Sequence, residues 1–410
     1  MEPILIIGII IVTGFLLGEL AARWGLPGIT GYMLAGVLLN PGLTHFIPAS
    51  FIQHTDPITR MALSFITFSV GGSVLFSTIR SLGKRILLIT LCEAEIAFLA
   101  ILAAFTFLGP LLIARPEASL VVFFLPLSLL LASLAVPTDP SAVLAVKHEY
   151  QAKGDVTATI MSVAAFDDIL GIINFSLGMT VAGLLVMKEP LSVMSFLQPF
   201  FVIAGSIVLG TVFGLILNGI TRLIQNDNEG TLIVVVFGLL ALCYGVAETL
   251  NLEALLTTMT MGIIVTNYNM QREKVFQVLE RYTETLILVL FFTISVMHLN
   301  FSVLAANYLL IFIFVVFRAL GKVGGTMLGA AISGAPTPVR RYTAGGLLPQ
   351  GGIVIGLALI MRQNPAFAEI SPIVINVIIG ATIIHELSGP VIAKAALKKA
   401  GDLSSGPPSV

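Results

Sequence analysis

Apolar segments that carry almost no charge, most of them long enough to cross a bilayer, follow one another along nearly the whole chain. About 20 apolar residues, each rising 1.5 Å in a helix, suffice for one crossing. Of the 410 residues, 57% are hydrophobic and only 10% are charged, and the mean hydropathy is +1.03. Soluble domains carry about 25% charged residues. The sequence therefore predicts an all-α polytopic membrane protein.

The apolar pattern divides the chain into thirteen predicted transmembrane spans. Their ranges are 3–22, 27–43, 58–78, 86–112, 119–147, 156–187, 196–222, 231–248, 253–269, 283–299, 302–332, 342–362 and 370–398. The range 27–43 is short and rich in glycine, and 119–147 contains Pro137 and Pro140. Both ranges are candidates for broken helices, because proline removes a backbone donor and clashes with the preceding turn.

Lys and Arg between the spans predict the orientation, because short inside loops carry an excess of both residues. With the N-terminus outside, the inside loops and tail hold fifteen basic residues and the outside loops hold four. An even number of spans would destroy this bias. We therefore expect the N-terminus outside and the C-terminus in the cytoplasm, followed by a short tail over 400–410. The N-terminus lacks the basic region of a signal peptide, so we expect the first run to be retained as a helix.

Several classes of protein find no support in this sequence. The formal net charge of −1 argues against a nucleic-acid partner. The two cysteines, Cys92 and Cys243, lie in apolar segments and give neither a disulfide framework nor a metal-binding spacing. No nucleophile–base pair or phosphate-binding loop stands out. The sequence therefore predicts a transporter in place of an enzyme, with no cofactor.

Asp167 and Asp168 stand side by side inside the apolar range 156–187. One carboxylate at mid-membrane depth already costs roughly 2.5–3.5 kcal/mol on insertion scales. Two of them must face a wet cavity or a cationic partner, and they would titrate as one coupled unit. This chemistry suits competition between a cation and protons, with a purely structural ion pair as the simpler alternative.

Two basic residues, Arg318 and Lys322, fall inside the predicted span 302–332. Four positions apart, they share one helix face. A buried lysine changes its protonation readily, so Lys322 is the candidate partner of Asp167 and a possible source of a proton when a cation binds. Arginine stays charged in proteins, and we expect Arg318 to be structural.

Two pairs of segments form a weak internal repeat. The range 25–36 resembles 251–262, and Val136-Pro137-Thr138-Asp139-Pro140 matches Leu348-Pro349-Gln350-Gly351-Gly352. Members of the first pair would cross the membrane in opposite directions, and members of the second are helix-breaking clusters inside apolar runs. An inverted repeat with one broken helix in each half is typical of secondary transporters.

Asp139 has two compatible roles that the sequence leaves open. It is a candidate N-cap of a helix that begins at Pro140, where it would also offset the positive helix ends that meet at a crossing of broken helices. Direct coordination of a cation by its carboxylate is the second role. Freed backbone carbonyls near Pro140 would add further oxygen ligands.

Four further polar residues lie at membrane depth. Glu95 is a candidate for lining the site or bonding across helices, and we expect Glu93 nearer the interface. In the last span, His385 and Glu386 are adjacent. For His385 an interhelical hydrogen bond is favoured over a pH-sensing role. Glu386, like Glu95, is a possible supporting residue.

Six motifs, in this order, resemble those of bacterial monovalent cation:proton antiporters. They are Gly25-Leu26-Pro27 with Ala35-Gly36, Thr138-Asp139-Pro140, Phe166-Asp167-Asp168, Gly321-Lys322, Pro349-Gln350-Gly351-Gly352 and Glu386-Leu387-Ser388-Gly389-Pro390. Singly most are weak, but the set is specific and extends over essentially the whole chain. The double aspartate resembles the electrogenic Na+/H+ branch of that family.

The resemblance implies two crossed broken helices and a homodimer whose subunits move like an elevator. An interface domain would comprise 1–79 and 230–300, a core ion-transport domain 84–187 and 302–399, and a linking helix 196–222. Asp168 would coordinate the cation, and Asp167 would pair with Lys322. The crossing would hold Thr138, Asp139, Pro140, Gln350 and Gly351.

We therefore predict an electrogenic Na+(Li+)/H+ antiporter of the bacterial inner membrane that serves pH homeostasis. Two protons would move for each monovalent cation, since the site offers two carboxylates and a titratable lysine. The alternatives are a K+/H+ antiporter of the same family and a sodium-coupled organic anion symporter of similar fold. The predicted partners are the lipid bilayer, the cation, protons and a second copy of the chain.

Overall fold

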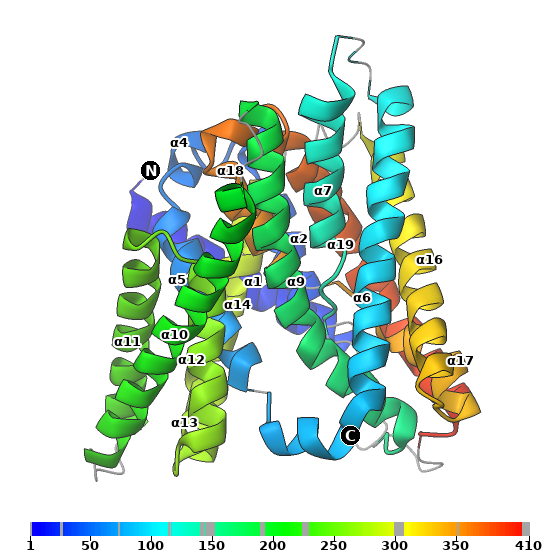
Figure 1. Ribbon diagram of the computed structural model, residues 1–410. Helices are drawn as coiled ribbons and strands as arrows, with labels where there is room; N and C mark the ends of the chain where they lie inside the picture. Colours follow the sequence, from blue (N-terminus) through cyan, green and yellow to red (C-terminus); the bar gives the residue numbers. More distant parts are fainter. Residues whose placement is uncertain are drawn as a thin grey trace.

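The computed structural model describes residues 2–24, 28–72, 74–113, 115, 117–139, 143, 152–188, 193–223, 229–298, 307–350 and 352–403. Within these residues every regular element is helical, as Figure 1 shows. The helices are α1 (Pro3–Arg23), α2 (Gly28–Leu38), α3 (Pro41–Thr44), α4 (Ala49–Ile52), α5 (Asp56–Gly72), α6 (Phe76–Leu112), η1 (Leu120–Phe124), α7 (Leu125–Leu134), α9 (Asp155–Met187), α10 (Val193–Leu223), α11 (Glu229–Thr249), α12 (Ala254–Tyr268), α13 (Arg272–Leu279), η2 (Glu280–Glu284), α14 (Thr285–Met297), α16 (Tyr308–Ile332), α17 (Thr337–Gly346), α18 (Gly352–Arg362), η3 (Pro365–Phe367) and α19 (Ser371–Ala400).

Each of the thirteen predicted spans coincides with a helix or with a pair of helical pieces, and the all-α prediction is confirmed. Six helices of the described residues are long and apolar enough to cross a membrane, by length and composition: α1, α6 from Gly83, α9, α10 from Phe200, α11 and α16. Boundaries shift most where polar residues continue a helix. The run α13–η2–α14 begins at Arg272, well before the predicted start at 283.

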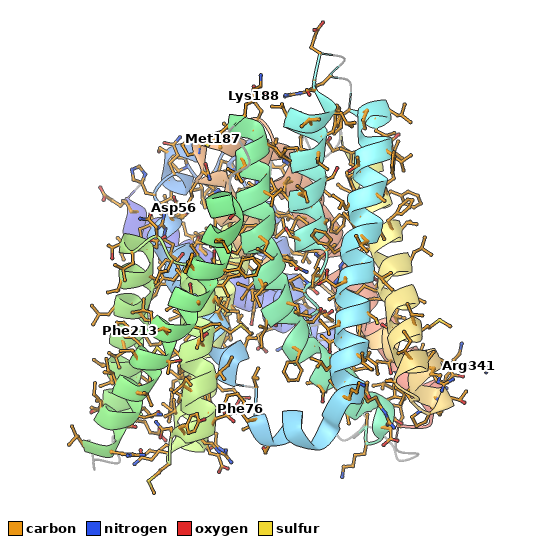
Figure 2. The ribbon with its side chains drawn as sticks, viewed as in Figure 1. Asp56, Phe76, Met187, Lys188, Phe213 and Arg341 are labelled. Atoms are coloured by element: carbon orange, nitrogen blue, oxygen red, sulfur yellow. The ribbon has the colours of Figure 1, made fainter. Side chains whose placement is uncertain are left out.

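The surface of the molecule is rich in large apolar side chains. Exposed examples come from several helices and include Phe107, Leu111, Val208, Val234 and Val391. Figure 2 shows such side chains pointing outward along the helices, with Lys188 at the upper end and Arg341 toward the lower end. An apolar surface of this extent is expected of a protein whose solvent is lipid.

The helix α6 consists of two pieces. Gly83 has φ 64° and ψ −160°, which is not helical and favours glycine. The short piece 76–82 lies across the lower end of the molecule, and the long piece rises beside α16 (Figure 1). The turn at Gly83 therefore directs α6 into the membrane-sized bundle that carries Glu93.

Three glycines let α16 approach α6 closely. Gly321, Gly325 and Gly329 are spaced at four residues and therefore lie on one face of α16. A Cβ at Gly325 would lie 2.4 Å from the carbonyl oxygen of Cys92 and 2.6 Å from the Cα of Glu93. Small residues at this spacing bring helix backbones together in membranes. The close contact brings Lys322 within reach of α6.

We expect Gly325→Val to lower stability by about 1–3 kcal/mol, the usual cost of overpacking. Both atoms that the new Cβ would meet belong to the backbone of α6, so the helices must separate. The measurement is the thermal unfolding midpoint in detergent. Gly324→Val is the matched control, because a Cβ at Gly324 meets nothing within 4 Å. Equal midpoints for the two variants would contradict the proposed close packing.

Two predicted spans are broken helices, and they meet. In the range 119–147, α7 ends at Leu134 and the chain continues without helix to Asp139. In 342–362, α17 ends at Gly346 and α18 begins at Gly352. The amide of Asp139 donates to the carbonyl of Pro349, 3.1 Å away, and so joins the two breaks. In the third candidate, 27–43, α2 ends at Leu38 and the short helix α3 begins at Pro41.

The lower ends of α9 and α19 are fastened to each other. The carboxylate oxygen Oδ2 of Asp402 accepts hydrogen bonds from the amide and the hydroxyl of Thr157, each 2.8 Å long. The amide of Lys153 donates to the carbonyl of Asp402, also at 2.8 Å. Gly154, the N-cap of α9, offers no side chain of its own. Asp402 thus caps the helix that carries Asp167 and Asp168.

Candidate functional site

Asp167 is the centre of a buried polar cluster at the crossing of the broken helices. Its oxygen Oδ2 accepts a hydrogen bond from the Thr138 hydroxyl at 2.5 Å and lies 2.6 Å from Nζ of Lys322. Nζ also donates to the Thr138 hydroxyl, 2.8 Å away. All three side chains are fully enclosed. The structure therefore brings Asp167 of α9 together with Lys322 of α16, its expected partner, and with Thr138 from the break after α7.

Lys322 has a second carboxylate partner, Glu93 of α6, which the sequence analysis did not assign to the site. Oε1 of Glu93 forms an ion pair with Nζ, and neither side chain is exposed. The same nitrogen also donates to the carbonyl of Val136. The expectation that Glu93 lies nearer the interface is wrong. The close packing at Gly325 places the backbone of Glu93 directly against α16.

Arg318 binds the backbone carbonyls at both helix breaks. Its guanidinium donates to Ala135 at 2.9 Å and to Pro137 at 2.8 Å, beyond the end of α7, and to Leu348, beyond the end of α17. Carbonyls that follow a helix end have no partner within the helix and carry its negative dipole end. The structural role expected of Arg318 is therefore present as a set of contacts, one turn from Lys322 on the same helix face.

Three carboxylates of the site keep oxygens without a hydrogen-bond partner in the described part of the chain. They are the buried Oδ1 of Asp167, the buried Oε2 of Glu93 and the carboxylate of Asp168, for which no hydrogen bond or ion pair occurs among these residues. Asp168 is 6% exposed, whereas Asp167 is 0% exposed. The charges of Asp139 and Asp167 act on Asp168. Oxygen atoms that lack a donor are the ligands that a small hard cation requires.

The charges of the site do not balance. Glu93, Asp167 and Asp168 face two cationic side chains, Arg318 and Lys322, within the same buried cluster. With all five groups ionised, one negative charge remains without a counter-charge. Buried charge is stable only when paired. While Lys322 stays charged, one monovalent cation or one added proton balances the charges of these five groups.

Gln350 joins the second break to α7 and to α19. Its side-chain nitrogen donates to the carbonyl of Leu134 at 2.7 Å, which leaves Oε1 as an acceptor. Nδ1 of His385 lies 3.2 Å from that oxygen, so it carries the proton. The interhelical hydrogen bond expected of His385 is confirmed.

The remaining predicted residues lie at the crossing, apart from the cluster or outside the described residues. Glu95 accepts from Asn174 of α9 at 3.0 Å and so bonds across helices, one of its two expected roles. Asp139 lies at the crossing through its backbone. Pro140 and Gly351 fall outside the described residues, as does the side chain of Glu386.

The family description "Sodium/hydrogen exchanger, transmembrane" matches residues 7–395, nearly the whole chain. The chain belongs to this sodium/hydrogen exchanger family. It is therefore an integral membrane transporter and not an enzyme, as the sequence predicted.

Individual members of the sodium/hydrogen exchanger family resemble the chain to different degrees. Na(+)/H(+) antiporter 1 of Methanocaldococcus jannaschii is 25% identical over 185 residues, which cover 45% of this chain and 41% of that relative. A structure of the sodium proton antiporter MjNhaP1 from Methanocaldococcus jannaschii at pH 8 aligns with a TM-score of 0.76 and 20% identity, over 98% of this chain and 99% of that one. An electron-microscopy map of the same antiporter aligns with a TM-score of 0.73 and 21% identity, over 99% of this chain and 100% of that one. These similarities confirm the predicted fold.

Glu93 is the one residue of the cluster that sequence reasoning missed. A signal was available in the charges: two basic residues on one helix face, Arg318 and Lys322, imply more than one carboxylate partner. Gly321 and Gly325 lie on either side of Lys322 and indicate the face of α16 that packs against another helix. Glu93 and Glu95, both in the predicted span 86–112, were the candidates for this second carboxylate.

Proposed function

We propose that this chain exchanges Na+ or Li+ for protons across the membrane at Asp167 and Asp168. The observation that carries the proposal is the unequal pairing of the two aspartates. Asp167 shares one oxygen with Lys322 and Thr138 and keeps the other without a partner, and Asp168 has no partner among the described residues. Membership of the sodium/hydrogen exchanger family supports the same substrates.

The proposed cycle begins with a proton on Asp168 and with Lys322 charged. A cation that enters takes oxygens from both aspartates, which requires Asp168 to lose its proton. Asp167 then turns from Lys322 to the cation. In one state Asp168 holds a proton and Asp167 pairs with the protonated lysine. In the other state both aspartates bind the cation. The cation and the protons therefore exclude each other from the site.

We further propose that two protons leave for each cation, which makes the exchange electrogenic. Once Asp167 releases Lys322, the ammonium keeps Glu93 as its only carboxylate partner and lies beside the cationic Arg318. A buried lysine loses its proton readily. Glu93 can turn to Arg318, on whose charge it already acts. Loss of the lysine proton then supplies the second proton.

Alternating access would come from movement of the core domain (84–187 and 302–399) against the interface domain (1–79 and 230–300), with α10 as the linking helix. The proposal includes a homodimer with the N-terminus outside. Packing within the chain supports this division, since α6 packs against α7, α9 and α16, α7 packs against α9, and α10 packs along α12.

Purified protein in proteoliposomes tests the exchange and its charge balance together. We expect a sodium gradient to drive proton movement, and an imposed membrane potential alone to accumulate sodium. For one net charge per cycle, about 59 mV corresponds to a tenfold sodium gradient at equal pH on both sides. Potential-independent exchange would remove the electrogenic claim and leave the exchange itself. Proton movement with potassium but not with sodium or lithium would favour the K+/H+ alternative.

A further inference from the structure

Two hydrogen bonds at the end of α18 connect parts of the chain that the proposed function assigns to different domains. Arg362 and Gln363 belong to the core range 302–399, and their partners His298 and Arg60 belong to the interface ranges. Figure 1 shows the α18 label at the upper end of the molecule, which is the predicted outer end, with α4 and the N-terminus nearby. The contacts lie far from the short piece 76–82 at the lower end.

Arg60 of α5 is fixed by its own domain and reaches into the other. One nitrogen of its guanidinium, Nη1, donates to both carboxylate oxygens of Glu248 at the end of α11. The other, Nη2, donates to Oε1 of Gln363. A hydrogen bond between two charged groups is stronger than one between neutral groups. Glu248 therefore holds Arg60 on the interface side while Nη2 contacts the core domain.

His298, which follows α14, accepts from the core domain in a single protonation state. Nη1 of Arg362 lies 2.9 Å from its Nδ1, and arginine can only donate. Nδ1 is therefore unprotonated, and the ring carries its proton on Nε2. That nitrogen lies 3.2 Å from the hydroxyl of Thr55, which in turn donates to the carbonyl of Ile52 at 2.7 Å. His298 is thus a neutral acceptor for Arg362, and the Thr55 hydroxyl fixes the other side of its ring.

Near these two hydrogen bonds, the end of α14 is held by side-chain hydrogen bonds within the interface ranges, whereas α18 packs against α5 through a glycine. The side-chain nitrogen of Asn40 donates to the carbonyls of Val296 at 3.2 Å and Met297 at 3.1 Å, which fixes the end of α14. On α18, a Cβ at Gly356 would lie 2.2 Å from Cδ2 of Leu63 of α5. Helix α18 therefore lies directly on α5. Among the described residues, the side-chain hydrogen bonds that hold the end of α18 to α5 and His298 are those of Gln363 and Arg362.

We propose that Arg60, His298, Arg362 and Gln363 form a latch that ties the outer end of the core domain to the interface domain and opens in every transport cycle. The latch rests on the proposed function, because a core domain that moves must take α18 along α5 and α14. Both bonds join polar groups at an accessible surface, where each contributes little net energy. They can therefore break and re-form during the cycle while still favouring the closed position.

Cross-linking tests whether the latch must open. In a background with Cys92→Ser and Cys243→Ala, the pair Arg60→Cys and Gln363→Cys is joined by a bis-methanethiosulfonate reagent about as long as the side chains it replaces. Both sites are accessible, since the Arg60 side chain is 32% exposed and Gln363 is exposed. We expect cross-linking to reduce sodium-driven proton movement at least tenfold and reduction of the linker to restore it. The matched control joins Arg60→Cys to Glu248→Cys, within one domain, and should leave exchange unchanged.

Spin labels give a readout that does not depend on transport. Labels at Gln363→Cys and Glu248→Cys should show two distance populations in lipid, whose ratio changes when sodium replaces protons. A single short distance under every condition would overturn the latch, as would full exchange after complete cross-linking or equal inhibition by the control pair. Two populations without any cation-driven proton movement would leave the latch standing and remove the proposed function.

Discussion

Asp168→Asn is expected to reduce cation-driven proton movement to the rate of empty vesicles. The asparagine oxygen still accepts hydrogen bonds, but the side chain can neither carry a proton nor offer a charge to the cation. Asp168 is the carboxylate of the cluster that no described residue pairs, so no other group replaces its negative charge. The measurement is proton uptake into proteoliposomes under a sodium gradient.

The matched control for Asp168→Asn is Asp155→Asn, the same substitution on the same helix. Asp155 is exposed in the first turn of α9 and lines a surface pocket with Lys84 and Arg85, away from the crossing. We expect its variant to exchange at the rate of the unmodified chain. Full exchange by Asp168→Asn would refute the proposed cation site, whatever the other variants do.

Lys322→Met is expected to lower stability by about 3–5 kcal/mol, the usual effect of removing one partner of a buried ion pair. The substitution leaves Asp167 and Glu93 enclosed without the ammonium that lies between them. Protonation of the two carboxylates relieves the unpaired charge in the folded state, so the folded variant binds more protons than the unfolded chain. Its stability should therefore fall as pH rises. The measurement is the unfolding midpoint in detergent at several pH values.

Removing the stranded charges should restore the stability of Lys322→Met. The triple variant Lys322→Met, Asp167→Asn and Glu93→Gln keeps the shapes of the side chains and has no buried carboxylate opposite the missing lysine. We expect its midpoint to return toward that of the unmodified chain, while exchange stays lost. The double variant Lys322→Met, Asp167→Asn, which keeps Glu93, should be less stable than the triple variant. Equal stability of the two would mean that Glu93 does not pair with Lys322, and the assignment of two carboxylates to Lys322 would be wrong.

The sequence was sufficient to predict the parts of the site that helix breaks define. The prolines of 136–140 and 348–352 identify two interrupted helices, and the structure joins them through Asp139 and Pro349. The pairing of Asp167 with Lys322 followed from having few charges to pair inside the membrane. In both cases a strong local cost, a lost backbone bond or a buried charge, leaves few solutions.

The role of Glu93 depended on information that local costs do not contain. Glu93 and Glu95 are two positions apart and point to nearly opposite sides of α6. Which of them meets Lys322 is decided by the rotation of the helix about its axis, and packing against neighbouring helices sets that rotation. The contact of Gly325 with the backbone of Glu93 fixes it here. In 27–43 the interruption lies between Leu38 and Pro41, and the glycines of this range lie within α2.

Arg318 joins the two broken helices at their carbonyl ends, and this has a consequence for the energetics of transport. Because one side chain holds Ala135, Pro137 and Leu348, the breaks move together with the carboxylates that they surround. We expect the cation to keep the same ligands, and hence the same intrinsic affinity, on either side of the membrane. A ligand with equal affinity for two states does not shift the balance between them. Such a device is a reversible exchanger with no built-in direction, and the ion gradients alone decide which way it runs.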